Sequence, residues 1–123
     1  MSDQAAVLAE PIGEALTAWA STARERLTIV APFIKRKAIE RLASGVGPAV
    51  RLTVVTRWRV EEICAGVSDL DVLDFVGGRP SGRLLLHPSL HAKVVLVDDA
   101  VACVGSANIT DAALGFASAA NLE

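Results

Sequence analysis

The sequence predicts an α/β domain built on a mixed β-sheet that is flanked by helices on both faces. Two observations lead to this prediction. In the first part of the 123-residue chain, short β-branched segments alternate with helical segments, which is the pattern of a parallel sheet. Later, three strand-like segments follow in quick succession, and only Asp98-Asp99 separates the last two. So short a connection predicts an antiparallel hairpin, and the sheet should therefore be mixed.

The first half of the chain predicts helix, strand, helix and strand in turn. Pro11 suits the first turn of a helix, and Leu16 and Trp19 follow it at helical spacing. The β-branched segment that stops before Pro32 is typical of a short buried strand, and Gly45 ends the helical segment after it. The expected elements are a helix over about 11–24, a strand over 27–30, a helix over 35–44 and a strand over 51–56.

The second half predicts two short helices, a loop and three strands. Ser68 or Asp69 can cap the second helix, and a loop rich in glycine and proline follows it over 77–82. Apolar β-branched runs then predict strands on both sides of the Asp98-Asp99 turn. The expected elements are helical pieces over about 61–65 and 70–76, and strands over 83–86, 91–97 and 100–104.

Composition excludes several classes of protein. Hydrophobic residues make up 52% of the chain and charged residues 21%, which excludes a disordered chain. No apolar run approaches the ~18 residues that a membrane span needs, and the acidic N-terminus is not a secretory signal. Two cysteines, Cys64 and Cys103, exclude a disulfide scaffold and a cysteine-based zinc cluster. We therefore expect a single cytoplasmic domain over 1–123, without stable membrane insertion.

Charge is distributed unevenly within a net charge of −2. Residues 1–60 hold nine basic and five acidic side chains, whereas residues 61–123 hold three basic and nine acidic ones. This distribution fits one positive patch on a mildly acidic body rather than a protein that is basic throughout.

The chemistry is carried by His91 and Lys93, followed by Ser106 and Asn108. In a strand, His91 and Lys93 project from the same face as neighbours. If Asp98-Asp99 is a two-residue turn, Ser106 lies opposite His91 and shares that face. An imidazole, an ammonium, a hydroxyl and an amide then meet, which suits a tetrahedral phosphate with a nucleophile for its phosphorus.

Two further residues of this segment have simpler interpretations. Gly105 should let the backbone approach closely at the rim of the site. Asp98 lies an odd number of residues after His91, so in a strand their side chains point to opposite faces. This position predicts a structural role for Asp98 in the turn.

The pattern His91-x-Lys93-x4-Asp98-x6-Gly105-Ser106-x-Asn108 resembles the HKD signature of the phospholipase D superfamily. Asn121-Leu122-Glu123 resembles the distal Asn-x-Glu element of the same family. The resemblance implies a phospholipase D-like fold and a phosphodiesterase that cleaves or transfers phosphodiesters without a metal ion or other cofactor. The reaction would pass through a phosphohistidine intermediate.

The resemblance also implies a role for each matched residue. His91 would be the nucleophile, Glu123 would hydrogen-bond its ring, and Asp98 would support the site without direct attack. The implied catalytic set is His91, Lys93, Asn108, Glu123 and Asp98, and the implied phosphate-binding set is Lys93, Ser106 and Asn108.

These enzymes use two copies of the motif, and this sequence contains one. His87, the other histidine, is followed by Pro88 and lacks the lysine of the motif. Two completions are open: a homodimer with the site on its axis, or a longer chain of which this is the N-terminal half.

Two basic clusters follow predicted strands, Lys35-Arg36-Lys37 and Arg57-Trp58-Arg59. Ligands of open α/β sheets gather outside carboxyl strand ends, so both clusters could reach a polyanion, and Trp58 could stack on a base. A solvated helix face and a partly buried tryptophan explain them equally well. We expect a nuclease that cleaves DNA or RNA. The alternatives are a phospholipid-cleaving or phosphatidyl-transfer enzyme, and a non-catalytic half that binds phosphate backbones or assembles with a partner.

Overall fold

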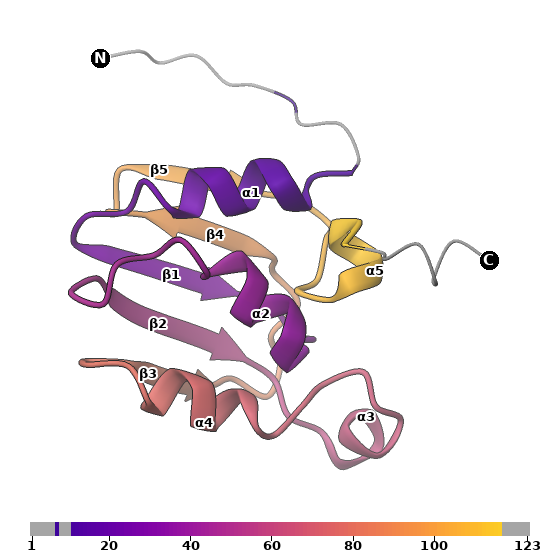
Figure 1. Ribbon diagram of the computed structural model, residues 1–123. Coiled ribbons are helices and arrows are strands. Elements are labelled where there is room, and N and C mark those ends of the chain that lie inside the picture. Colours follow the sequence, from indigo (N-terminus) through magenta and orange to yellow (C-terminus); the bar gives the residue numbers. More distant parts are fainter. Residues whose placement is uncertain (1–6, 8–10, 117–123) are drawn as a thin grey trace.

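The computed structural model describes residues 7 and 11–116, which form one five-stranded sheet and five helices (Figure 1). The strands are β1 (Arg26–Val30), β2 (Arg51–Thr56), β3 (Arg83–Leu86), β4 (Val94–Val97) and β5 (Val101–Val104). The helices are α1 (Gly13–Ala20), α2 (Arg36–Leu42), α3 (Val60–Cys64), α4 (Val72–Gly77) and α5 (Asp111–Leu114). In this part of the chain, no helix is both long and apolar enough to span a bilayer.

The sheet is mixed, as the sequence predicts. Its strand order is β3-β2-β1-β4-β5, with β1, β2 and β3 parallel to one another. β4 pairs with the other side of β1 in the antiparallel sense, and β5 pairs antiparallel with β4. The expected α/β architecture is therefore confirmed.

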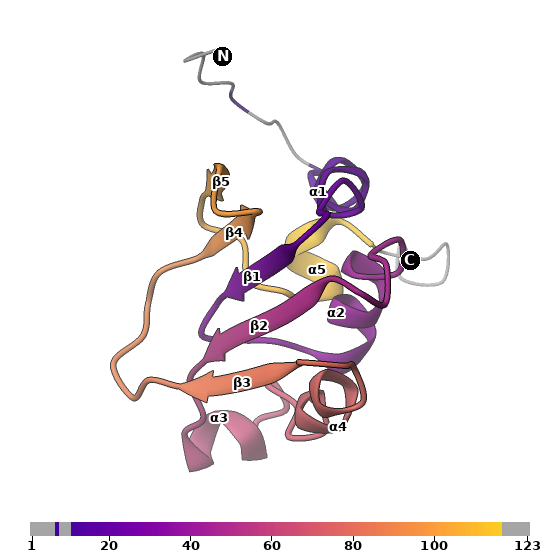
Figure 2. The ribbon, with the colours of Figure 1, turned by 90° about the vertical axis from the view of Figure 1, so that its left-hand side faces the viewer.

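The helices differ from the expected arrangement, because α1, α2, α4 and α5 all lie on one face of the sheet (Figure 2). The reason is the strand order. From β1 to β2 to β3 the chain steps in one direction across the sheet, and right-handed crossovers in one direction place their helices on the same face. Thr28, Thr53 and Leu96 point to the opposite face, where they are half-buried.

The core lies between the sheet and this helical layer. Leu27 and Ile29 of β1 and Leu52 and Val54 of β2 alternate with half-buried neighbours and are themselves fully buried. Each such aliphatic side chain stabilises the fold by roughly 1.5–3 kcal/mol through burial. The helices contribute Leu16, Ala20, Ile39, Leu42, Val72, Val76 and Leu114 to this core.

Parallel and antiparallel strands together bring several chain segments to one edge of the sheet, which we call the carboxyl edge. The ends of β1, β2 and β3 lie there. Because β4 runs antiparallel to β1 and β5 antiparallel to β4, the start of β4 and the end of β5 lie at the same edge. The segments that flank His91 and Asn108 therefore meet the segments that follow β1 and β2.

Candidate active site

His91 and Lys93 lie in segment 87–93, which connects β3 to β4 across the carboxyl ends of β2 and β1 (Figure 2). The strand expected over 91–97 begins only at Val94, so both residues precede it. His91 is exposed and Lys93 is half-buried. The Lys93 Nζ donates a hydrogen bond to the His91 carbonyl oxygen at 3.0 Å. The two residues thus lie together at the open start of β4.

The register predicted from a two-residue turn is wrong by one residue. The turn itself forms at Asp98-Asp99: both residues have positive φ, and the Ala100 N–H donates to the Val97 carbonyl at 3.1 Å. Val97 also lies opposite Val101, however, so Ala100 is an extra residue after the turn. Such a bulge shifts the pairing along the hairpin by one.

The one-residue shift changes the partners across the hairpin. Lys93 lies opposite Gly105, whose N–H donates to the Lys93 carbonyl at 3.1 Å. The predicted pairing of His91 with Ser106 is therefore wrong, and so is that of Lys93 with Val104. Ser106 is exposed in the segment that leaves β5. The two segments nevertheless run side by side at the carboxyl edge.

Asn108 is held by the segment that follows β1. Its Oδ1 accepts a hydrogen bond from the Phe33 N–H at 3.2 Å. A parallel bridge between Ile34 and Ile109 fixes the same contact, and the Ile109 N–H donates to the Phe33 carbonyl at 3.1 Å. Among the described residues, the Asn108 amide nitrogen has no hydrogen-bond acceptor.

The four matched side chains lie at one edge but do not bind one another. Among the described residues, no hydrogen bond joins the side chains of His91, Lys93, Ser106 and Asn108. The described part of the chain also contains no group of three or more His, Cys, Asp or Glu residues placed to hold a metal ion.

Arg57 and Arg59, expected as nucleic-acid contacts, both bind carbonyls of segment 87–93. Arg57 is only 9% exposed, and its Nη1 donates to the Leu90 carbonyl at 2.9 Å. The Arg59 Nη2 donates to the Pro88 carbonyl at 3.0 Å and remains largely exposed. Arg57 therefore lies beneath the segment that carries His91, whereas Arg59 lies at its surface.

Trp58 is half-buried beside the exposed helix α3. It lines an open, largely apolar hollow of about 230 Å³ together with Arg59, Val60, Ile63, Cys64 and Leu70. Val60 is 76% exposed and Leu70 53% exposed, so this apolar surface faces solvent. A planar ring could lie against it near the carboxyl edge.

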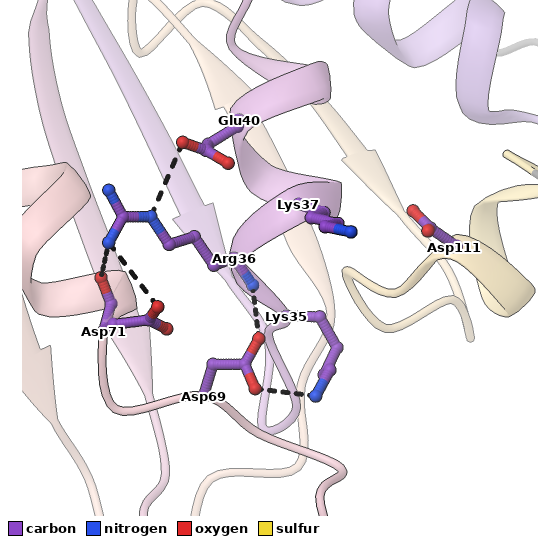
Figure 3. Close-up of a pocket in the computed structure, with 7 residues that line it drawn as sticks. All are labelled: Lys35, Arg36, Lys37, Glu40, Asp69, Asp71 and Asp111. Atoms are coloured by element: carbon purple, nitrogen blue, oxygen red, sulfur yellow. Dashed lines mark hydrogen bonds and ion pairs between the residues drawn. The ribbon is translucent and has the colours of Figure 1, made fainter.

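The basic cluster Lys35-Arg36-Lys37 lines an open cleft of about 550 Å³ (Figure 3). The cleft lies between three parts of the chain: α2, α5 and the segment that precedes α4. Acidic side chains neutralise most of its charge. The Lys35 Nζ lies 2.6 Å from Asp69 Oδ1, and Arg36 forms longer ion pairs of 3.5 Å with Glu40 and Asp71. The full lining is Lys35, Arg36, Lys37, Glu40, Asp69, Asp71 and Asp111. The expected basic patch is therefore a mixed-charge surface here.

Asp69 ties the cleft to α2. Burial raises the pKa of this carboxyl, but the hydrogen bonds from Lys35 and from the Arg36 N–H outweigh burial and lower the pKa below its ordinary value. The carboxylate therefore stays ionised and accepts the Arg36 N–H at the start of α2.

Asp98 lies at the far end of β4, roughly 16 Å from Lys93 by the rise of an extended chain. Its carboxylate accepts hydrogen bonds from the N–H groups of Arg24, Glu25 and Arg26 at 2.8–3.2 Å. The N–H groups of Arg26, Glu25 and Arg24, in that order of effect, lower the pKa of Asp98. These contacts agree with the structural role in the turn that the sequence position of Asp98 predicts.

Two residues of the motif resemblance, Asn121 and Glu123, lie outside the described residues. Two residues that the sequence did not predict are Phe33, which holds Asn108, and Glu62, which pairs with Arg57. A glutamate in the first turn of the helix directly after Arg57-Trp58-Arg59 was the available signal for that pair.

Comparisons with known proteins support the fold. No protein-family model matches the chain, and no curated protein matches it. Among solved structures, the chain is similar to NucT from Helicobacter pylori, with a TM-score of 0.65 and 18% sequence identity. The match covers 82% of this chain and 69% of NucT. At this identity the likeness shows the fold alone, a mixed α/β sheet.

Proposed function

We propose that this chain is one half of a metal-independent phosphodiesterase that cleaves DNA or RNA through a phosphohistidine at His91. The observation that carries the proposal is the meeting of segment 91–93 with segment 105–108 at the carboxyl edge. The phospholipase D-like fold shared with NucT supports the same class.

In the proposed reaction, a ring nitrogen of His91 attacks phosphorus, a P–N bond forms and the bond to the leaving oxygen breaks. The Lys93 ammonium, the Ser106 hydroxyl and the Asn108 amide nitrogen would donate to the phosphate oxygens as their charge increases. Water then attacks the phosphohistidine, which restores His91 and releases the second product. Glu123 would orient the ring, and Asp98 would support the site from a distance by fixing the turn between β4 and β5.

Protonation of the leaving oxygen needs a second acid, which the resemblance assigns to a second motif copy. A second copy of this chain or a further part of a longer chain would supply it. Specific activity that falls on dilution, together with light scattering at twice the mass of one chain, would support the homodimer. Activity that is independent of concentration in a monomer would contradict it.

Nucleic acid is the proposed substrate because Trp58 and Arg59 lie beside segment 87–93, with an apolar hollow next to a cation. A base and its phosphate offer complementary groups to such a surface. Turnover of phospholipid vesicles, with none of oligonucleotides, would favour the phospholipid alternative instead.

The test is hydrolysis of bis(p-nitrophenyl) phosphate in EDTA. We expect turnover by the natural chain and loss of turnover in His91→Ala with unchanged circular dichroism. The matched control is His87→Asn, which retains an acceptor for the Ser89 N–H that His87 Nδ1 now binds. Rapid quenching in alkaline denaturant should trap a phosphoryl adduct on His91, because the P–N bond is labile in acid and stable in alkali. Equal turnover in His91→Ala would refute the proposed reaction through His91, and absence of turnover in the natural chain would leave the non-catalytic alternative.

A further inference from the structure

Arg57 is the most completely bound cation of the candidate site. Its Nε lies 3.1 Å from Glu62 Oε1 and its Nη2 lies 2.6 Å from Glu62 Oε2, a bidentate pair. Its Nη1 donates to the Leu90 carbonyl at 2.9 Å. The guanidinium also lies over the Phe33 ring, 5.2 Å from the ring centroid. The side chains of Arg57 and Glu62 are only 10% and 18% exposed.

These contacts join the two parts of the site. Leu90 directly precedes His91, so the bond to its carbonyl fixes the backbone that carries the imidazole. Phe33 supplies the N–H that holds Asn108 Oδ1 at 3.2 Å. One guanidinium therefore contacts the residue before His91 and the residue that holds Asn108.

The same contacts make Arg57 a poor phosphate ligand. All three of its nitrogens already have acceptors, and Glu62 neutralises its charge. Arginine suits this arrangement because its planar fork binds both oxygens of the Glu62 carboxylate in parallel while Nη1 reaches a carbonyl, a geometry that the compact ammonium of lysine does not reproduce. A phosphate would have to displace a buried ion pair.

We propose that Arg57 and Glu62 form a clamp that positions the candidate catalytic groups, so that Arg57 is a positioning residue rather than a nucleic-acid contact. The clamp holds segment 87–93 against the Phe33–Asn108 contact. This inference rests on the proposed function for its catalytic consequence, but its structural part is independent of turnover.

The experiment compares Glu62→Gln and Arg57→Lys with two matched controls. Glu61→Gln changes the exposed neighbouring acid on α3, and Arg51→Lys makes the same substitution at the exposed opposite end of β2. We expect faster amide hydrogen exchange over segment 87–93 in the two clamp variants and not in the controls. Circular dichroism and Tm identify any variant that has lost its fold, and Glu62→Gln is the milder change.

A second readout follows the imidazole itself. The chain has two histidines, so ¹⁵N-histidine labelling gives two ring systems, which His87→Asn assigns. We expect the His91 ring signals to shift or broaden in Glu62→Gln. We also expect kcat to fall about 10- to 100-fold with KM nearly unchanged, because misplaced reacting groups slow the chemical step.

If Arg57 instead contacts the phosphate of a nucleic acid, Glu62→Gln should affect binding rather than the His91 segment. Removing the Glu62 charge would free Arg57, and oligonucleotide binding by Glu62→Gln would become tighter. Arg57→Met would then lower the slope of log binding constant against log salt by about one. Tighter binding, or unchanged exchange and unchanged His91 signals, would overturn the clamp. A natural chain without turnover would refute the proposed function alone, since exchange and ring signals still decide the clamp.

Discussion

Lys93 and Gly105 lie opposite each other at the open end of the β4–β5 hairpin, joined by the Gly105 N–H that donates to the Lys93 carbonyl at 3.1 Å. A Cβ at position 105 would meet no other heavy atom within 4 Å. Packing within the described protein therefore does not explain the glycine. The space beside it is open toward Lys93, where a phosphate would lie in the proposed function.

Gly105→Ala should separate folding from substrate access. We expect the free energy of unfolding to change by at most about 0.5 kcal/mol, as for other unpacked surface positions. Hydrolysis of a nucleic-acid substrate should fall, because the added methyl group occupies space beside Lys93. Urea unfolding and steady-state kinetics give the two values. The contrasting variant is Gly82→Ala, whose Cβ would strike the Val76 carbonyl and cost about 1–3 kcal/mol of stability.

Lys93→Gln should lower activity far more than stability. Lys93 is half-buried at the open end of the hairpin, and among the described residues its ammonium bonds only to the His91 carbonyl two residues before it, so Tm should change little. In the proposed reaction its charge stabilises the phosphate oxygens, and its loss should lower kcat about 10²- to 10³-fold. Lys37→Gln, an exposed lysine on α2, serves as the control. Full activity in Lys93→Gln would contradict the proposed phosphate-binding role.

Asp98→Asn should lower thermal stability in a pH-dependent way. The folded state lowers the pKa of Asp98 below its ordinary value of 3.8, so the ionised carboxylate stabilises the fold. This contribution is fully present above that value and is lost as pH falls through the lower folded-state pKa. We therefore expect a lower Tm than the natural chain at pH 7 and a difference that shrinks below about pH 4. A Tm difference that stays constant down to pH 2 would argue against this linkage.

Trp58 should report nucleic-acid binding directly. With Trp19 changed to Phe, an oligonucleotide that stacks on Trp58 should quench the remaining tryptophan fluorescence. Replacing Trp58 by Ala should weaken binding by roughly 1–3 kcal/mol, the usual range for one stacked base. The measurement is a fluorescence or anisotropy titration at fixed salt. Undiminished affinity in Trp58→Ala would place the substrate elsewhere on the carboxyl edge.

The sequence predicted helices and strands correctly where their limits depend on neighbouring residues alone. The predicted strands over 51–56 and 83–86 coincide with β2 and β3, since β-branched or leucine-rich runs there end at clear breaks. The helix predicted to about residue 24 ends at Ala20 instead. Asp98, more than seventy residues away in sequence, binds the N–H groups of residues 24–26, where the chain bends into β1.

The details of the candidate site depended on contacts between distant segments. The predicted hairpin register was wrong because Ala100 is an extra residue opposite Val97, and alternation within the hairpin does not reveal such a bulge. Arg57 was expected to reach a polyanion because it follows the carboxyl end of a strand, but Glu62 and Leu90 bind it below segment 87–93. The sheet topology was enough to predict that the two motif segments lie close together. Whether a charged side chain is paired or exposed depends on its partner, which the sequence does not name.

The placement of β4 next to β1 also has a consequence for the order of folding. The units β1-α2-β2 and β2-α4-β3 close over short sequence separations, whereas β1 must join β4 across nearly seventy residues. Closure over that separation costs more chain entropy, so we expect the hairpin to dock after the parallel part has formed. His91 and Asn108 would meet the rest of the site only at that late step. Mild denaturant should then abolish turnover before it removes the helical signal.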